Sequence, residues 1–296
     1  MIRVIGIGDN VCDKYVRQKK MYPGGQALNF AVYSRMLGAQ AAYLGVFGTD
    51  GVAEHVMWAL DEYQVDRSRC RQYAGENGCA RVSLVNGDRI FLGSNQGGVL
   101  KMHPLALSRE DLNYAAGFHL AHTSNNSYMD TQLPRLKTCG VPISYDFSGQ
   151  WTDVQRVARV APYTDYAFLS CGSLTPAQTR TLCRNVHEKG AGMVVATRGS
   201  QGAVIFDGIS FYDQAPKPVE AIDTLGAGDS FAAAFLLSLT EWRLANEIRV
   251  AGDRESFSRA VSRAAERAAE FSAKTCMEYG AFGHGRPYAE EEADKR

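Results

Sequence analysis

Apolar segments alternate between two patterns along most of the chain. Ile2–Gly8 is a short apolar run that ends in glycine, which is typical of a buried strand. Ala27–Leu37 carries apolar residues at helical spacing and stops at Gly38, a common helix terminator. Ala42–Phe47 again has the pattern of a strand, and Val52–Tyr63 that of a helix. This alternation predicts β–α units.

The same alternation continues into the second half of the chain. A helix is predicted over Pro176–Glu188, and further strands over Phe118–Ala121, Val141–Asp146, Tyr166–Leu169 and Met193–Thr197. Strands that are separated by helices pair in parallel and are covered by those helices. The predicted fold class is therefore α/β, with a central, mostly parallel sheet flanked by helices.

Two segments predict hairpins instead. Cys79–Val85 alternates between apolar and polar residues, Asn86-Gly87 is a turn signal, and Arg89–Leu92 returns as a strand. A second hairpin is predicted around Val204–Tyr212. The first hairpin indicates a small β lid beside the main sheet.

The chain shows no internal repeat and no low-complexity linker, which favours a single domain. Its charged end is expected to be disordered. We expect a domain over residues 1–285, lid segments at about 11–23 and 70–98, and a tail over 286–296.

Composition limits the classes of protein that the chain can represent. It has 296 residues, of which 45% are hydrophobic, and Lys plus Arg equals Asp plus Glu at 32 each. Nothing in this balance indicates a nucleic-acid partner. No apolar run approaches the roughly 18 residues that cross a bilayer. The seven cysteines form no Cys-x-x-Cys pair, so we expect reduced thiols, a cytoplasmic protein and no membrane partner.

The strongest candidate for chemistry is Asp223-Thr224-Leu225-Gly226-Ala227-Gly228-Asp229, which leads into a predicted helix. A helix N-terminus presents free N–H groups and a positive dipole end, so the amides of residues 226–228 are candidates to hold a phosphoryl group. Asp229, beside that anion site, is a candidate base for an attacking hydroxyl. A structural helix cap uses the same residue types, so this segment alone leaves both interpretations open.

A second glycine motif lies near the N-terminus. Gly24-Gly25-Gln26-Ala27-Leu28-Asn29 opens the first helix, and Gly8-Asp9-Asn10-Val11-Cys12-Asp13 follows the first strand. Turns before helices often use such residues for structure alone. Gly6-Ile7-Gly8 lacks the third glycine of a dinucleotide-binding fingerprint, which disfavours that function.

The two motifs, in this order and within an alternating α/β chain, resemble the two signatures of the PfkB, or ribokinase-like, carbohydrate kinases. The resemblance covers residues 2 to about 283. It implies that Asp229 is the catalytic base, that Gly226, Ala227 and Gly228 form the anion hole, and that Asp223 lies near a monovalent cation. It also implies that sugar hydroxyls contact Asp13, Gly24, Gly25 and Asn29, with Asp9 as a weaker candidate.

A third segment is the candidate nucleotide-binding site. Thr197-Arg198-Gly199-Ser200-Gln201-Gly202 follows a predicted strand and resembles the family's Thr-x-Gly-x-x-Gly segment. By that resemblance Thr197, Arg198, Gly199 and Gly202 bind ATP, and the helix Glu266–Thr275 covers the adenine. A solvated loop arginine would have the same pattern as a phosphate-binding Arg198.

The expected cofactors are ATP and Mg²⁺, with K⁺ as a further candidate. Many members carry Asn-x-x-Glu, which organises the magnesium, but Leu169-Ser170-Cys171-Gly172-Ser173-Leu174 has no acid. No magnesium ligand is therefore assigned, and Asp146 is one acid that could hold the ion through water.

Several segments resemble the fructoselysine 6-kinase branch of the family. The resemblance implies transfer of the γ-phosphoryl group to O6 of fructoselysine or a related Amadori compound. Arg81 and Arg89 on the first hairpin are candidates for the carboxylate of the amino-acid part, although solvated strand residues look the same. Related enzymes dimerise through their lids, so a homodimer is expected. The segments are Gly8-Asp9-Asn10, Gly24–Tyr33, Asp88-Arg89-Ile90-Phe91, Tyr145-Asp146-Phe147-Ser148 and Gln214-Ala215-Pro216.

Two other functions stay open at this point. One is another PfkB sugar kinase, such as a fructokinase, ribokinase or ketodeoxygluconate kinase. The other is a non-catalytic sugar- or nucleotide-binding regulator, which only the missing acid after Leu169 supports and which the intact Asp229 segment disfavours.

Overall fold

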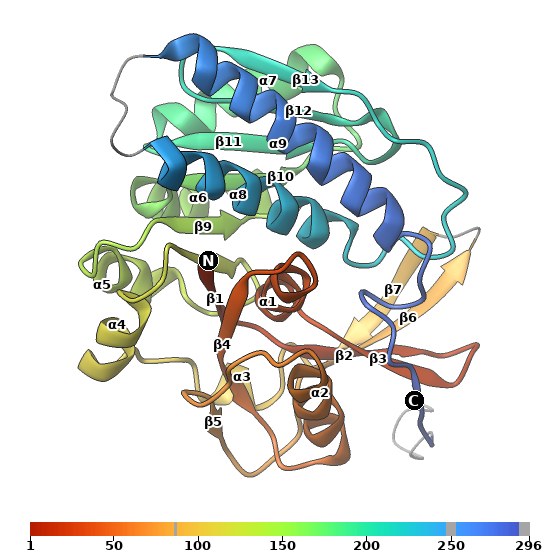
Figure 1. Cartoon of the computed structure of the whole chain (residues 1–296). Coiled ribbons are helices and arrows are strands. Elements are labelled where there is room, and N and C mark those ends of the chain that lie inside the picture. Colours follow the sequence, from red (N-terminus) through yellow and green to blue (C-terminus); the bar gives the residue numbers. More distant parts are fainter. Residues whose placement is uncertain (86–87, 247–252, 290–296) are drawn as a thin grey trace.

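The computed structural model describes residues 1–85, 88–246 and 253–289 (Figure 1). Nine described strands form the main sheet, in which six neighbouring pairs are parallel and two pairs at one edge are antiparallel. The predicted α/β fold with a mostly parallel sheet is confirmed. In spatial order the strands are β13 (Phe211–Gln214), β12 (Ala203–Phe206), β11 (Met193–Thr197), β10 (Tyr166–Ser170), β9 (Ile143–Asp146), β8 (Leu120–Ser124), β1 (Arg3–Gly8), β4 (Gln40–Phe47) and β5 (Arg71–Gln72).

A second sheet of five described strands lies beside the main one (Figure 1). It contains the predicted hairpin, whose turn at 86–87 lies outside the described residues, and two further strands from the predicted lid segment 11–23. Two residues of the predicted tail also belong to it, whereas residues 290–296 lie outside the described part. In spatial order the strands are β14 (Arg286–Pro287), β3 (Lys20–Gly24), β2 (Val11–Tyr15), β6 (Cys79–Val85) and β7 (Asp88–Ser94).

Helices cover both faces of the main sheet and give it two hydrophobic cores. Val4 on β1 faces one core, and Ile5 and Ile7 face the other, because successive strand residues point to opposite faces. The first core contains α1 (Gln26–Met36), α2 (Gly51–Glu62), α8 (Ala227–Asn246) and α9 (Arg254–Thr275). The second contains α3 (Val99–Met102), α4 (Arg109–Ala115), α5 (Leu133–Lys137), α6 (Val154–Val160) and α7 (Pro176–Glu188).

The start of α1 is fixed by a residue from another element. The N-cap residue Gly25 has no side chain to bond the first N–H groups of the helix, which a helix leaves unpaired. Asp9, just after β1, supplies the acceptors instead: its Oδ2 accepts from Gln26 N at 2.7 Å and its Oδ1 from Ala27 N at 3.2 Å. The end of β1 and the start of α1 are therefore held together.

A buried polar network joins the two sheets next to this point. Asn10 Nδ2 donates to the Tyr43 hydroxyl at 3.0 Å and to Val46 O at 2.9 Å. Asn77, just before β6, donates from Nδ2 to Asn10 Oδ1 at 2.8 Å and accepts from Gly48 N at 3.1 Å. Because unpaired buried polar groups are costly, this network fixes how the second sheet stands over the ends of the parallel strands.

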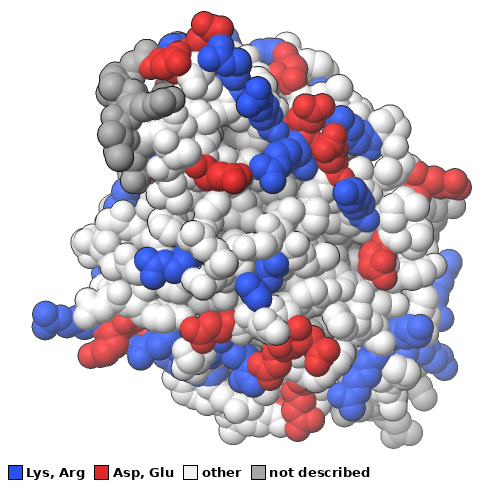
Figure 2. Space-filling view, viewed as in Figure 1, with Lys and Arg blue, Asp and Glu red and all other residues white. Residues whose placement is uncertain are grey.

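Acidic and basic side chains are mixed over the face shown in Figure 2, in keeping with the neutral total charge. Across residues 1–85, 88–246 and 253–289, no helix is both long enough and apolar enough to cross a membrane.

Candidate active site

A cavity of about 630 Å³ lies between the C-terminal ends of the central strands, the second sheet and the start of α8. Ligands of open α/β sheets bind at this edge, outside the carboxyl ends of the strands. The cavity brings together residues that both glycine motifs contribute. The sequence-predicted residues that line it are Asp9, Asp13, Gly25, Asn29, Gly226, Gly228 and Asp229.

Asp229 and Asn29 form the polar centre of the cavity. Asp229 lies in the first turn of α8 and is 8% exposed, and Asn29 on α1 donates from Nδ2 to Asp229 Oδ2 at 2.6 Å. The other amide atom, Asn29 Oδ1, is buried and has no hydrogen-bond partner among the described residues. An unpaired buried acceptor costs about 1–3 kcal/mol. The site is therefore suited to a ligand that brings a hydroxyl donor.

Gly226 must be glycine for two reasons. Its φ is 75°, in the left-handed region. A Cβ there would lie 2.3 Å from the Tyr33 hydroxyl and 2.9 Å from Ala281 Cβ. Burial, and then the negative charge of Asp229, raise the pKa of Tyr33 well above its usual value, so the hydroxyl stays protonated and donates to the Ala281 carbonyl. The glycine segment is thus seated between α1 and the C-terminal part of the chain.

The other predicted anion-binding residues differ in their surroundings. The N–H of Ala227 donates to Thr224 O at 3.3 Å, and Ala227 is not among the described residues that line the cavity. Gly228 lines it, and a Cβ on Gly228 would meet no atom within 4 Å. Of the three, Gly226 and Gly228 therefore border the open space at the start of α8.

Asp223 is fully buried and holds three parts of the chain together. Its carboxylate accepts from the Tyr15 hydroxyl of β2 at 2.5 Å, from Leu225 N at 3.0 Å and from Gly280 N at 2.9 Å. The second sheet, the glycine segment and the C-terminal part all meet on this carboxylate. Among the described residues, no group of three or more His, Cys, Asp or Glu side chains could hold a metal ion.

Asp9 and Asp13 also line the cavity, and two glycines let the chain approach them. Besides the α1 amides, Asp9 Oδ1 accepts from Ser124 Oγ and Ser127 Oγ, both at 2.8 Å. Asp13 is 4% exposed and lines the cavity. A Cβ on Gly24, which is itself not among the described lining residues, would lie 2.9 Å from Asp13 Oδ2. Asp9 is thus chiefly an anchor, whereas Asp13 is a buried acid in the cavity wall beside the Gly24–Gly25 turn.

Gly25 completes this turn between β3 and α1. Its φ is 113°, and a Cβ there would lie 2.7 Å from Asn10 Cα. Any side chain at this position would separate the start of α1 from the end of β1 and move Asn29.

Asp146, at the end of β9, is a buried acid with little compensating charge. Burial raises the pKa of Asp146 to about 6, and the Asp9 charge adds to this, while the Ser148 N–H (2.6 Å) and the Gln26 side chain oppose it. The carboxylate lines the cavity. It is suited to a positively charged neighbour.

The predicted nucleotide segment lies at the end of β11 and is not among the described residues that line the cavity. Arg198 is 8% exposed, and its guanidinium donates to Leu174 O at 3.1 Å and to Gln201 Oε1. It therefore ties this turn to the segment after β10 where the family acid is missing. Thr197 ends β11, and Gly199 (φ 56°) and Gly202 (φ 87°) form the turn itself.

Of the two arginines predicted for the hairpin, only Arg81 has a described side chain, and it does not line the cavity. Ala80 on β6 lines the cavity. Arg81 is not among the described lining residues, because its side chain points to the other face of the sheet. The backbone of Arg89 lies in β7, and its side chain lies outside the described part.

Arg156, which was not predicted, lines the cavity. Arg156 on α6 pairs with Asp130, with Nε and Oδ2 2.8 Å apart, and donates from Nη2 to Asn125 O at 2.6 Å. Sequence reasoning missed it, together with most of the polar residues after the ends of β8, β9 and β10. Most of these residues follow the carboxyl end of a parallel strand, where ligands of such sheets bind, and this position could have identified them from the sequence. The missed lining residues include Asn125, Asn126, Ser148, Gln150, Arg156 and Ser170.

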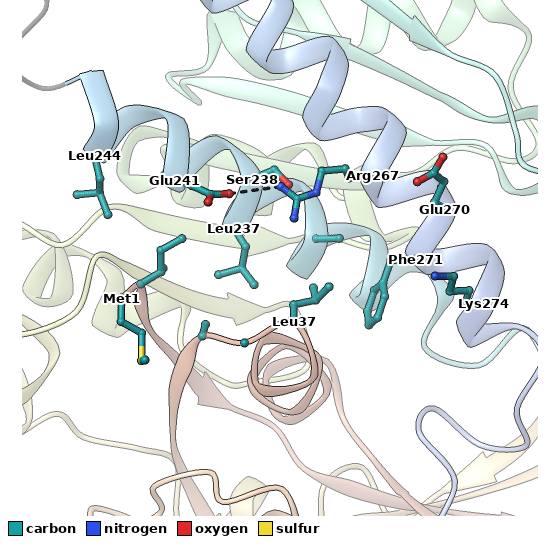
Figure 3. Close-up of a pocket in the computed structure, with 14 residues that line it drawn as sticks. Met1, Leu37, Leu237, Ser238, Glu241, Leu244, Arg267, Glu270, Phe271 and Lys274 are labelled. Carbon is teal, nitrogen blue, oxygen red and sulfur yellow. Dashed lines mark hydrogen bonds and ion pairs between the residues drawn. The ribbon is translucent and has the colours of Figure 1, made fainter.

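A second cavity, of about 540 Å³, lies between α1, α8 and α9 (Figure 3). It has apolar walls that include Leu37, Leu237 and Phe271, and a rim on which Arg267 and Glu241 pair at 3.3 Å. The helix predicted to cover the adenine contributes Arg267, Glu270, Phe271 and Lys274 to its lining, but none of the residues predicted to bind sugar, phosphate or the cation lines it. None of its described side chains has an unpaired buried polar atom. The cavity at the strand ends is therefore the candidate active site.

Comparison with known proteins agrees with this assignment. Residues 1–281 match the family described as pfkB family carbohydrate kinase. The fructosamine kinase FrlD of Bacillus subtilis (strain 168) is 41% identical over 294 residues, 98% of this chain and 96% of that protein. The fructoselysine 6-kinase of Escherichia coli (strain K12) is 35% identical over 233 residues, 78% of this chain and 86% of that protein.

A solved structure of Arabidopsis thaliana ribokinase, complexed with ribose and ATP, matches with a TM-score of 0.72 at 19% identity. It covers 95% of this chain and 94% of that chain. This likeness shows the fold, and the predicted ribokinase-like architecture is confirmed.

Two glycine variants test the seating of the segment before α8. Gly226→Ala is expected to lower the free energy of unfolding by about 2–4 kcal/mol, because it forces a left-handed backbone and a clash with Tyr33. Gly228→Ala is the matched control and should change it by less than about 1 kcal/mol, since nothing lies near its Cβ. Urea unfolding followed by tryptophan fluorescence measures both. Similar, small losses in both variants would contradict the described seating of Gly226.

Proposed function

This chain belongs to the pfkB family of carbohydrate kinases, and we propose that it transfers the γ-phosphoryl group of ATP to O6 of fructoselysine or a related Amadori compound. The family supports the kinase activity itself. The acceptor is supported by the two relatives that are named as fructosamine and fructoselysine kinases. The observation that carries the proposal is the Asp229–Asn29 pair in the cavity, in which Asn29 Oδ1 is a buried acceptor without a hydrogen-bond partner among the described residues.

Asp229 acts as the base in an in-line displacement. The acceptor oxygen forms a bond to the γ-phosphorus while the bond from that phosphorus to the bridging oxygen of ADP breaks, and the hydroxyl proton passes to Asp229. Asn29 orients the carboxylate through its 2.6 Å hydrogen bond and accepts from a second sugar hydroxyl at Oδ1. The amides of Gly226 and Gly228, at the positive end of α8, face the charge on the moving group.

Asp13 and the turn at Gly24 and Gly25 hold the remaining sugar hydroxyls. A carboxylate accepts two hydrogen bonds from neighbouring hydroxyls, and Asp13 is buried in the cavity wall beside Gly24. Asp9 supports this part of the site by fixing the start of α1.

The nucleotide lies against the turn of Thr197, Gly199 and Gly202, and α9 borders its base. In this proposal Arg198 positions that turn, since its guanidinium is already bonded to Leu174 and Gln201.

Mg²⁺ accompanies the ATP and, when bound, offsets the charge of its phosphates. This ion keeps several waters and needs only one or two protein carboxylates. Asp146 meets that need, because it is buried, lines the cavity and lacks a compensating charge. A K⁺ ion near Asp223 would be held by backbone carbonyl oxygens, because the carboxylate already accepts three protein donors.

The proposal also includes a homodimer in the cytoplasm. Ile90, Phe91 and Leu92 on the edge strand β7 are 47%, 61% and 52% exposed. An exposed apolar edge strand is a template for pairing with another chain, and a second copy would cover it. All seven cysteines are free thiols, which favours a reducing compartment.

A coupled ADP-release assay with Mg-ATP, potassium and a panel of acceptors tests the proposed reaction. We expect fructoselysine to give a kcat/KM at least about tenfold above those of fructose, ribose and ketodeoxygluconate, because the correct acceptor makes hydrogen bonds that the others lack. Phosphorus–proton correlation spectroscopy should place the phosphate on C6. A preference for a plain sugar would support the kinase activity and contradict fructoselysine as the acceptor. Silence across the panel would favour the non-catalytic regulator.

Sedimentation velocity tests the dimer. The wild-type chain should sediment as a dimer at assay concentration, and the double variant Ile90→Glu/Leu92→Glu as a monomer, because charges on β7 prevent edge pairing. Ile209→Glu is the control, since Ile209 is 77% exposed on the turn between β12 and β13. A wild-type monomer would reject the dimer.

A further inference from the structure

Asn125 is held firmly at the end of β8, yet one of its polar atoms has no partner. It is 7% exposed and lines the cavity. Its N–H donates to Asp146 O at 2.9 Å, its carbonyl accepts from Arg156 at 2.6 Å, and its Nδ2 donates to Asn126 Oδ1 at 3.3 Å. Among the described residues, its Oδ1 is buried without a hydrogen bond. A buried acceptor fixed in this way is suited to a donor that a ligand supplies.

A chain of hydrogen bonds connects Asn125 with the α1 helix that carries Asn29. Asn29 marks the reacting end, because it bonds Asp229 at 2.6 Å. Gln26 lies three residues earlier on the same face of the helix, and its Oε1 accepts from Asn126 Nδ2 at 2.9 Å. Asn126 Oδ1 in turn accepts from Asn125 Nδ2 at 3.3 Å. Asn125 therefore borders the same cavity as Asn29, separated from it by Asn126 and Gln26.

The charges around Asn125 favour a cation. Asp9 is a buried acid in the cavity wall, and its Oδ1 accepts from the hydroxyl of Ser124, the residue before Asn125. Arg156 is the cationic side chain among the described lining residues, and its charge is offset by Asp130, with Nε and Oδ2 2.8 Å apart. The local balance is therefore negative, and a positively charged group of a ligand would relieve it.

We propose that Asn125 Oδ1 accepts a hydrogen bond from the protonated amine attached to C1 of the acceptor, and so selects Amadori compounds over plain sugars. The proposal rests on the proposed function, since it names how that site recognises its acceptor. An Amadori compound carries a protonated amine at C1, where fructose carries a neutral hydroxyl. A charged donor makes the stronger hydrogen bond. Asn126 and Gln26 separate Asn125 from the Asn29–Asp229 pair, so Asn125 acts in binding and selection rather than in chemistry.

Two acceptors that differ only at C1, 1-amino-1-deoxyfructose and fructose, test this assignment. For Asn125→Ala, kcat/KM on the amino sugar should fall by about 10- to 100-fold, and on fructose by no more than about threefold. The loss on the amino sugar should lie mainly in KM. Asn113→Ala, exposed on α4, is the control and should leave both values unchanged.

Asn125→Asp is the second variant, because it keeps an acceptor of the same shape. It should retain the preference for the amino sugar even if the alanine variant folds poorly, which circular dichroism would reveal. An equal loss of both acceptors in Asn125→Ala, or loss of the preference in Asn125→Asp, would overturn the inference and leave the proposed function standing. A wild-type enzyme with no activity on any amino sugar would overturn both.

Discussion

The hydrogen bond from Asn29 to Asp229 joins the two helices on which the site depends. Asn29 comes from α1, near the N-terminus, and Asp229 from α8, and both helices pack on the same face of the main sheet. The bond has its 2.6 Å length only if both helices start at the right place. Asp9 fixes the start of α1, and Gly226, seated against Tyr33, fixes the start of α8. The carboxylate that is proposed to take the proton is therefore positioned by contacts between segments far apart in sequence.

Different parts of the cavity are proposed to carry out the phosphoryl transfer and to select the acceptor. In the proposed mechanism the start of α8 supplies the base and the amides that face the phosphoryl group, which every acceptor would need. The lining residues after β8 and β9 differ in kind: they are mainly amides and serines, with one arginine that pairs with Asp130. Since the fold is shared by kinases of many sugars, selectivity has to come from such strand-end residues. The cavity between α1, α8 and α9 lacks these unpaired polar atoms, and its rim charges pair with one another.

The sequence predicted the elements whose signals are local. The helix Pro176–Glu188 has the predicted bounds because Thr175 and Gln178 form a capping box beside a proline. The glycine segment was recognisable because its backbone needs small residues whatever surrounds it. Contacts between distant segments were not predictable. Nothing in the sequence shows that Arg198 turns inward to Leu174, or that Arg81 lies on the far face of β6. Asn125 and Arg156 were missed because only the folded chain brings the end of β8 and the helix α6 to the same cavity.

The proposed mechanism depends on Asp229 as the base, and the turnover of the variant Asp229→Asn tests that role. The variant keeps an acceptor for Asn29 and a side chain of the same size, so acceptor binding by titration calorimetry should change little. Turnover of Mg-ATP with fructoselysine should fall by about 10²- to 10⁴-fold, because the amide takes no proton. The exposed Asp213→Asn should behave as wild type in the same assay. Near-normal turnover by Asp229→Asn would contradict the assignment of the base, and with it the mechanism built on this hydrogen bond.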